Sequence, residues 1–258
     1  MSVLRGLIIA ISTFSRIPAP RVSWEGKAAG RALMFLPVVG VAIGAILLLW
    51  HALCTVLPVS AFFQAVGYTI LPLLITGAIH LDGFCDTADA LASNAEPTRR
   101  QEILHDSHVG AFAVIAVVIY ILAFVGLATE LDNSWPAAVS LAAIFVVSRG
   151  LAGLATLWAP CIGSSRFAVA FRNPRLKTSS TVVLVLWVAV GAALLVVCGC
   201  WPGVVALLIA ALLYLLAQFW LVRQFEGFSG DLAGWLIQMI ELGALAGLVF
   251  GALVLGLW

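Results

Sequence analysis

The segment HLDGFCDTADAL, residues 80–91, places three aspartates within eight positions of a chain that otherwise carries few charges. Asp82, Asp86 and Asp89 are spaced i, i+4 and i+7, so on a helix they share one face. Like charges at this spacing destabilise a helix, and aspartates are costly inside a bilayer. We therefore expect the stripe near the membrane interface or in a wet cavity, where Mg²⁺ would neutralise it. The alternative is a solvated acidic face at the end of a span.

Two later segments add acids. EILHDSHVGAF contains Asp106 and His108, and EGFSGDLAGWLIQMIEL contains Asp231 and Glu241. Asp231 would begin a helix, where acids are favoured. Glu241 falls ten residues into a predicted span, where an acid is usually functional. A packing partnership with Arg149, inside another predicted span, is the alternative for Glu241.

Basic side chains supply the complementary charge. The segment SSRFAVAFRNPRLKTSS holds four cations, beginning with Arg166, and Arg16 lies near the start of the chain. A basic loop beside a membrane often sets topology or contacts anionic lipid, whereas Arg149 needs an anionic partner if it is buried. Acids that bind a metal, together with arginines that clamp oxygens, are the components of a phosphoryl-transfer site. His80 and His108 adjoin the acids as candidate bases or phosphate ligands.

The composition predicts the elements that position these residues. Of 258 residues, 63% are hydrophobic and 10% are charged, against about 25% charged in a soluble domain. This excludes a soluble globular domain, and the net charge of +1 gives no indication of a nucleic-acid partner. We expect a single all-α polytopic helical bundle, residues 1–258, with an N-terminal interfacial helix. About seven transmembrane helices of about 20 residues are predicted at 32–57, 61–79, 111–129, 137–158, 181–200, 204–222 and 232–258.

The loop charges predict the topology. Arginine and lysine gather in the loops near residues 15–31, 80–110, 159–180 and 223–231, whereas the opposite connections PVS, ELDNSWP and CWPG contain none. Since positive loops favour the cytoplasmic side, we expect a multi-pass protein of the cell inner membrane whose polar loops face the cytoplasm. Chemistry gathered at one face favours an enzyme over a transporter, which usually needs access from both sides.

Several motifs resemble those of the cobalamin synthase family, adenosylcobinamide-GDP ribazoletransferase. They are FSRIPAP, GAIHLDGFCDTADAL, EILHDSHVGAFAV, SRGLAG and GFSGDLAGWLIQMIEL, which occur in the family's order from about residue 14 to 245. The resemblance implies a polytopic inner-membrane enzyme that requires magnesium. It would join adenosylcobinamide-GDP to α-ribazole, or to α-ribazole 5′-phosphate, and release GMP. Membrane lipid is a further expected partner, and a homo-oligomer is compatible with the sequence.

The resemblance also indicates site residues. The family's aspartate cluster corresponds to Asp82, Asp86 and Asp89, the acid of its DS-x-x-GAF motif to Asp106, and the acid of its GD turn to Asp231. We expect magnesium to be held by Asp82, Asp86, Asp89 and Asp231, and catalysis to involve these four with Asp106. The expected substrate-binding residues are Arg16, His80, His108, Arg149, Arg166 and Glu241. Gln238 stands where many relatives carry Glu, and an amide binds magnesium more weakly than a carboxylate does.

Two other functions use similar residues. A phosphatidyltransferase that acts on CDP-activated lipid also carries aspartates at helix ends, but its pattern D-G-x-x-A-R followed by G-x-x-x-D-x-x-x-D does not occur in this sequence. A cation-coupled transporter would use the acidic stripe as an ion path. Nucleotide release without a gradient distinguishes the synthase from the transporter.

Overall fold

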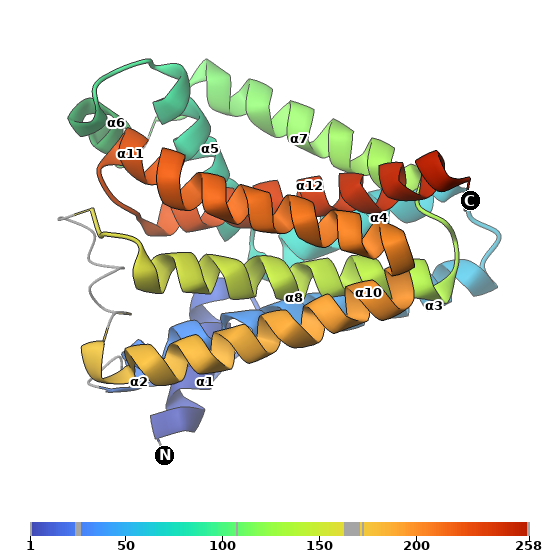
Figure 1. Ribbon diagram of the computed structural model, residues 1–258, viewed down its shortest axis with the longest axis horizontal. Helices are drawn as coiled ribbons and strands as arrows, with labels where there is room; N and C mark the ends of the chain where they lie inside the picture. Colours follow the sequence, from blue (N-terminus) through green and yellow to red (C-terminus); the bar gives the residue numbers. More distant parts are fainter. Residues whose placement is uncertain (1, 24–26, 107, 163–170, 172, 257–258) are drawn as a thin grey trace.

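Long uncharged segments form helices that lie roughly parallel or antiparallel to one another (Figure 1). The computed structural model describes residues 2–23, 27–106, 108–162, 171 and 173–256, and within these ranges it contains helices and no strand. The longer helices are α1 (Ser2–Phe14), α3 (Leu36–Val56), α4 (Ala61–Thr76), α5 (Ile79–Ala92), α7 (Ala111–Thr129), α8 (Trp135–Trp158), α10 (Lys177–Leu216) and α12 (Gly230–Leu255). The shorter elements are α2 (Lys27–Ala32), α6 (Pro97–Ile103), α11 (Val222–Phe225), 3-10 turns at Leu33–Phe35 and Pro174–Leu176, and a π-helical turn at Ala217–Leu221. The prediction of an all-helical membrane protein is confirmed.

The membrane-spanning helices agree with the predicted pattern. Five described helical stretches are long and apolar enough to cross a membrane, and the bent pair α4–α5 makes a sixth. One of the five, Pro174–Phe225, covers 52 residues and includes α10, whose backbone leaves helical geometry at Cys200 (φ 49°, ψ −131°). Figure 1 shows the chain turning back there. If the two halves of this stretch are counted separately, the total becomes seven crossings, as predicted.

Serine side chains mark the start of three of these helices. Ser60, Ser134 and Ser229 precede α4, α8 and α12, and each hydroxyl accepts a hydrogen bond from the backbone amide three residues later. Such caps satisfy one of the four amides that a helix N-terminus leaves without a partner. The polar connections in the sequence therefore determine where the helices begin.

Helix α8 lies at the centre of the bundle. Its most apolar window is 83% buried by protein, compared with 22% for α7, which lies at the edge. Helices α3, α10 and α12 pack around α8, and Gly40 and Gly44 of α3 allow its backbone to approach Phe145 and Ala142 closely. The ion pair between Arg149 of α8 and Glu241 of α12, described below, is therefore far from solvent.

The connections separate into two groups at opposite ends of the bundle. The C-terminal end of α5, α6, α11 and the start of α12 lie at one end in Figure 1, whereas the connections α3–α4 and α7–α8 and the turn within α10 lie at the other. The first end carries Arg99, Arg100 and Arg223, whereas the three connections at the opposite end contain no Lys or Arg. The charge asymmetry expected from the sequence is thus an asymmetry between two ends of the folded chain.

Candidate active site

Helix α5 begins at a break in the bundle. Gly77 (φ 64°) and Ala78 (φ 60°) both adopt left-handed backbone geometry, which ends α4, and α5 leaves at an angle of 95° to it. Glycine adopts this geometry without strain, whereas alanine does so at a cost. Asp82, Asp86 and Asp89 all lie on α5, as predicted, and none of the three is fully buried.

Two glycines bring α12 against α5. A Cβ atom on Gly83 would lie 2.7 Å from the Cα atom of Asp231, and one on Gly234 would lie 2.8 Å from the carbonyl oxygen of His80. Because only glycine permits such close approach, Asp231 at the start of α12 is held beside the acidic face of α5. The Asp86 carboxylate is close enough to those of Asp82 and Asp231 for their charges to repel.

Asp89 has a structural partner that the sequence did not indicate. Its two carboxylate oxygens accept hydrogen bonds from the amides of Gly110 (2.5 Å) and Ala113 (2.8 Å). These amides belong to the N-terminus of α7, where a negative charge is stabilising. Asp89 therefore joins α5 to α7, and both of its oxygens are engaged.

Asp106 and His108 form an exposed pair in the connection between α6 and α7. Nδ1 of His108 lies 2.6 Å from a carboxylate oxygen of Asp106, and the His108 amide donates to the same oxygen at 3.0 Å. These hydrogen bonds from His108 lower the pKa of the Asp106 carboxyl. Asp106 is thus oriented at the polar end of the bundle and remains ionised over a wider pH range than a free aspartate.

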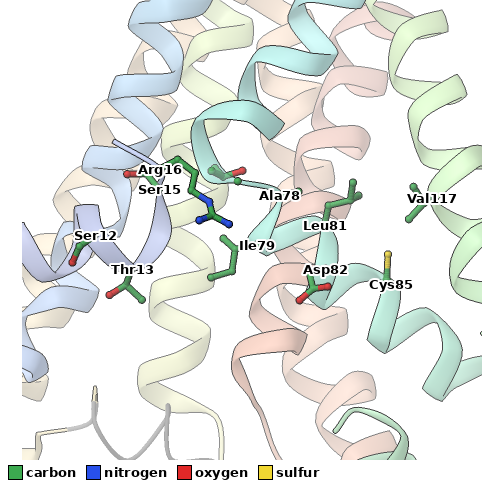
Figure 2. Close-up of a pocket in the computed structure, with 12 residues that line it drawn as sticks. Ser12, Thr13, Ser15, Arg16, Ala78, Ile79, Leu81, Asp82, Cys85 and Val117 are labelled. Atoms are coloured by element: carbon green, nitrogen blue, oxygen red, sulfur yellow. The ribbon is translucent and has the colours of Figure 1, made fainter. Parts of the chain in front are cut away.

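A cavity of about 610 Å³ opens beside α5, between the end of α1 and α7 (Figure 2). Arg16 and Asp82 are its charged lining residues. The hydroxyl side chains of Ser12, Thr13 and Ser15 also line it, on the α1 side. We did not anticipate these hydroxyls, although three of them immediately before Arg16 in an otherwise apolar segment are a recognisable signal.

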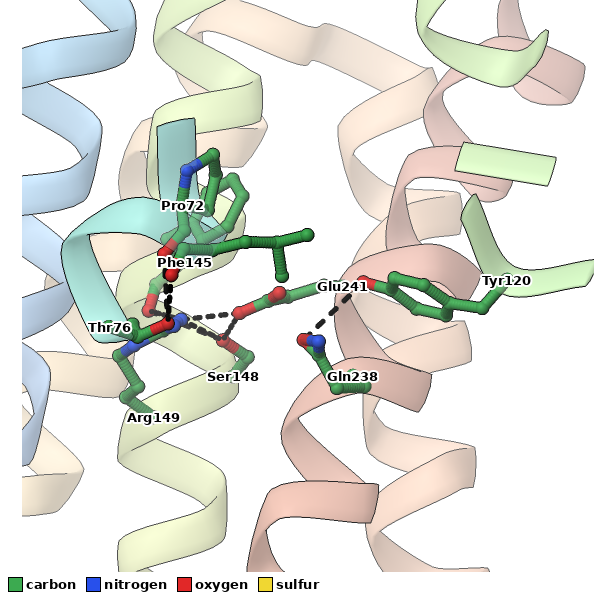
Figure 3. Close-up of polar contacts among 9 residues, drawn as sticks. Pro72, Thr76, Tyr120, Phe145, Ser148, Arg149, Gln238 and Glu241 are labelled. Atoms are coloured by element: carbon green, nitrogen blue, oxygen red, sulfur yellow. Dashed lines mark hydrogen bonds and ion pairs between the residues drawn. The ribbon is translucent and has the colours of Figure 1, made fainter. Parts of the chain in front are cut away.

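Arg149 and Glu241 lie in the core and neutralise each other. Arg149 of α8 donates to the Glu241 carboxylate of α12, to the carbonyl oxygen of Phe145 (3.1 Å) and to the Ser148 hydroxyl (3.1 Å), and the Ser148 hydroxyl donates to Glu241 at 3.2 Å (Figure 3). Both charged side chains are at most 3% exposed. The alternative interpretation, in which Glu241 is the packing partner of Arg149, thus describes the observed contact.

Two other residues considered in the sequence analysis, His80 and Gln238, are not among the described residues that line the cavity. His80 is 6% exposed, and neither ring nitrogen has a hydrogen-bond partner among the described residues; its ring stacks on Phe14. His80 therefore faces the packed side of α5 and does not line the cavity. Gln238 is buried beside Glu241 and accepts a hydrogen bond from the Tyr120 hydroxyl at 3.4 Å (Figure 3). Arg166 lies outside the described residues.

The acids at the junction of α5 and α12 have the chemistry of a magnesium site. Asp82, Asp86 and Asp231 offer only carboxylate oxygens, which Mg²⁺ prefers. Among the described residues, no three Asp, Glu, His or Cys side chains lie close enough together to hold an ion by themselves. Magnesium is usually held by one or two carboxylates together with water and substrate phosphates, so an oxygen-rich but incomplete set fits this ion.

The comparisons with known proteins identify the family. The model of the cobalamin-5-phosphate synthase family matches residues 6–249. The chain belongs to the cobalamin-5-phosphate synthase family. An adenosylcobinamide-GDP ribazoletransferase of Lachnoclostridium phytofermentans is 33% identical over 95% of this chain and 93% of its own length. The enzyme of the same name from Stutzerimonas stutzeri is 34% identical over 90% of this chain and 89% of its own length. No solved structure matches the chain.

Membership of the cobalamin-5-phosphate synthase family confirms the resemblance found in the motifs and favours the synthase over the lipid transferase and the transporter. The matched region begins within α1 and ends within α12. It therefore contains Arg16, the acidic face of α5, the Asp106–His108 pair and Asp231, so the family match covers the whole candidate site.

Proposed function

We propose that this protein joins adenosylcobinamide-GDP to α-ribazole, or to α-ribazole 5′-phosphate, and releases GMP. The observation that carries the proposal is the convergence of carboxylates from α5 and α12 at one end of the bundle, beside a cavity that contains an arginine. The names of the relatives give the substrates, and the carboxylates suit a diphosphate bound with a cation.

In the proposed reaction, a ribose hydroxyl of the acceptor attacks the phosphorus attached to the cobinamide. A new phosphorus–oxygen bond forms, the bond to GMP breaks, and the hydroxyl proton passes to a base. Asp106 is our candidate base, because its carboxylate is exposed at this end and His108 orients it. Since the family is named for a product that keeps a 5-phosphate, the attacking hydroxyl is not the 5′ one.

One or two of the carboxylates of Asp82, Asp86 and Asp231 would hold magnesium, with the donor's phosphates and water completing its coordination. Bound magnesium would neutralise the diphosphate and stabilise the leaving GMP. We assign Asp89 to a positioning role, because its oxygens already accept the α7 amides. Arg149 and Glu241 maintain the bundle from within and contact each other rather than substrate.

We further propose that the acidic end faces the cytoplasm of a bacterial inner membrane, because the positive side chains gather there. The five cysteines allow a direct test. Cys200 is exposed at the turn within α10, and Cys161 pairs with Phe228 just before α12, at the acidic end. In spheroplasts, a thiol reagent that does not cross membranes should label Cys200 and leave Cys161 unlabelled; the reverse pattern would contradict this orientation.

The activity itself is tested with purified protein in detergent. The protein should convert adenosylcobinamide-GDP and α-ribazole, or its 5′-phosphate, to a corrinoid product and GMP in equal amounts, and EDTA should stop the reaction until magnesium is restored. Asp82→Asn and Asp86→Asn should abolish turnover without unfolding the protein. Glu102→Gln is the matched control, because Glu102 is an exposed acid that pairs with Arg99 outside the site. Full activity in both aspartate variants would refute the metal assignment.

A further inference from the structure

Arg16 is held at the break between α4 and α5. Its backbone amide donates to the carbonyl oxygen of Ile75 at 2.7 Å, so the chain leaving α1 is fastened to the last turn of α4. Its side chain lies directly over Gly77, where a Cβ atom would collide with the Arg16 Nε, Cγ and Cδ atoms. The glycine therefore does two things: it turns the chain, and it leaves space for the arginine.

From this position the Arg16 guanidinium points into the cavity (Figure 2). Arg16 is exposed, and among the described residues it forms no ion pair. A guanidinium binds phosphate oxygens through two parallel hydrogen bonds. The cavity thus presents an anion-binding group on the α1 side, whereas Asp82 gives the α5 side a negative charge.

The size of the cavity distinguishes between the two substrates. At about 610 Å³ it falls within the range of about 300–1,000 Å³ that accommodates a drug-sized ligand. A nucleoside phosphate is a ligand of that size, but the donor, a corrinoid joined to a guanosine diphosphate, is much larger. Ile79, Leu81 and Val117 provide apolar walls for a heterocyclic base. The exposed Ser12 hydroxyl, which donates to the carbonyl oxygen of Ile9 at 3.1 Å, can still accept a hydrogen bond from a ribose hydroxyl.

We infer that Arg16 binds the 5′-phosphate of a phosphorylated acceptor and thereby determines a preference for α-ribazole 5′-phosphate over α-ribazole. The inference rests on the proposed function. With its phosphate held by Arg16 on the α1 side, the acceptor would extend its sugar across the cavity toward the acids of α5. The phosphate is not consumed in the reaction, so its binding serves selection and orientation.

The test compares both acceptors in the wild type and in Arg16→Ala, at saturating adenosylcobinamide-GDP and magnesium. Loss of one charge-assisted contact should lower kcat/KM for α-ribazole 5′-phosphate by about 10- to 100-fold. The value for α-ribazole should change by less than about threefold, because that acceptor has no phosphate to lose a contact. Arg16→Lys should recover part of the preference, since it keeps the charge but not the paired hydrogen bonds. Arg5→Ala, which removes an exposed cation of α1 that lies outside the cavity, should behave as the wild type.

Three results would overturn the inference. Equal losses for both acceptors would assign Arg16 a general structural role. A raised KM for the donor, with unchanged acceptor values, would place the guanidinium on the donor diphosphate. An unchanged preference in both Arg16 variants would remove it from the site. If Arg16→Ala does not fold, the Arg16→Lys comparison decides the matter alone. Absence of any product in the wild type would instead refute the proposed function.

Discussion

The contact between α5 and α12 at Gly83 allows a test of the site that changes no charged group. In Gly83→Ala, the new methyl carbon would lie 2.7 Å from both the Cα atom and the carbonyl oxygen of Asp231, whereas ordinary van der Waals contact begins at 3.4 Å. Because the atoms that it meets are backbone, no side chain can move aside, and the helices must separate by about 0.7 Å. Overpacking of this kind costs about 1–3 kcal/mol. A misplacement of about 1 Å can reduce turnover by about 100-fold, so we expect kcat to fall by about 10- to 100-fold as Asp231 moves from Asp86.

The assay measures GMP release at several magnesium concentrations, together with thermal unfolding in detergent. Gly126→Ala is the matched control, because Gly126 also lies within a helix but has no atom within 4 Å of its added Cβ. That variant should keep full activity and should be slightly more stable, since alanine favours helix more than glycine does. Wild-type turnover in Gly83→Ala would refute the view that close helix approach assembles the site. An equal loss in Gly126→Ala would show that any added methyl group in a helix is harmful.

Three further predictions concern the groups around the site. Glu241→Ala should destabilise the protein by about 3–5 kcal/mol, because it leaves Arg149 buried without its anionic partner, and a double Arg149→Met, Glu241→Leu variant should recover most of this loss in thermal unfolding. Asp89→Ala should lower the unfolding free energy by about 0.5–2 kcal/mol through loss of the α7 cap, whereas Asp89→Asn, which keeps one oxygen acceptor, should retain measurable turnover. His108 lowers the pKa of Asp106, so activity that requires ionised Asp106 persists to lower pH; His108→Ala should move the acidic limb of the pH–rate profile to higher pH, and an unmoved limb would exclude Asp106 as the titrating base.

The helices could be predicted from the sequence because lipid imposes a simple requirement. A segment of about 20 apolar residues must satisfy its backbone hydrogen bonds internally, so it forms a helix wherever it crosses the bilayer. The predicted span 111–129 coincides with α7, and the division of the long uncharged run falls at Cys200, within the CGCWPG segment. By contrast, the end of α4 at Thr76 was placed three residues too late. The left-handed geometry of Ala78 depends on tertiary packing, and alanine gives no sign of it in the sequence.

The sequence predicts the chemistry of the candidate site but not which role each of its residues has. Helical periodicity places Asp82, Asp86 and Asp89 on one face, and this is what the structure contains. Periodicity does not reveal that α7 begins beside Asp89 and uses both its oxygens. Nor does it separate His80, which faces the packed side of α5, from Asp82, which lines the cavity two residues later. Such distinctions depend on which neighbouring helix covers each side of α5.

The positions of the charges follow from the cost of burying them. Arg149 and Glu241 can remain at the centre of the bundle because each compensates the other and Ser148 adds a further hydrogen bond. A buried ion is tolerated only when it is paired in this way. Arg16 and Asp82 line an open cavity, where water lowers the cost of carrying a charge without a fixed protein partner. Charged side chains that are solvated by water can exchange that water for the charged groups of a substrate. The Arg149–Glu241 pair, by contrast, would have to break its own contact first. The same electrostatic cost thus assigns one pair to stability and leaves the other available for binding.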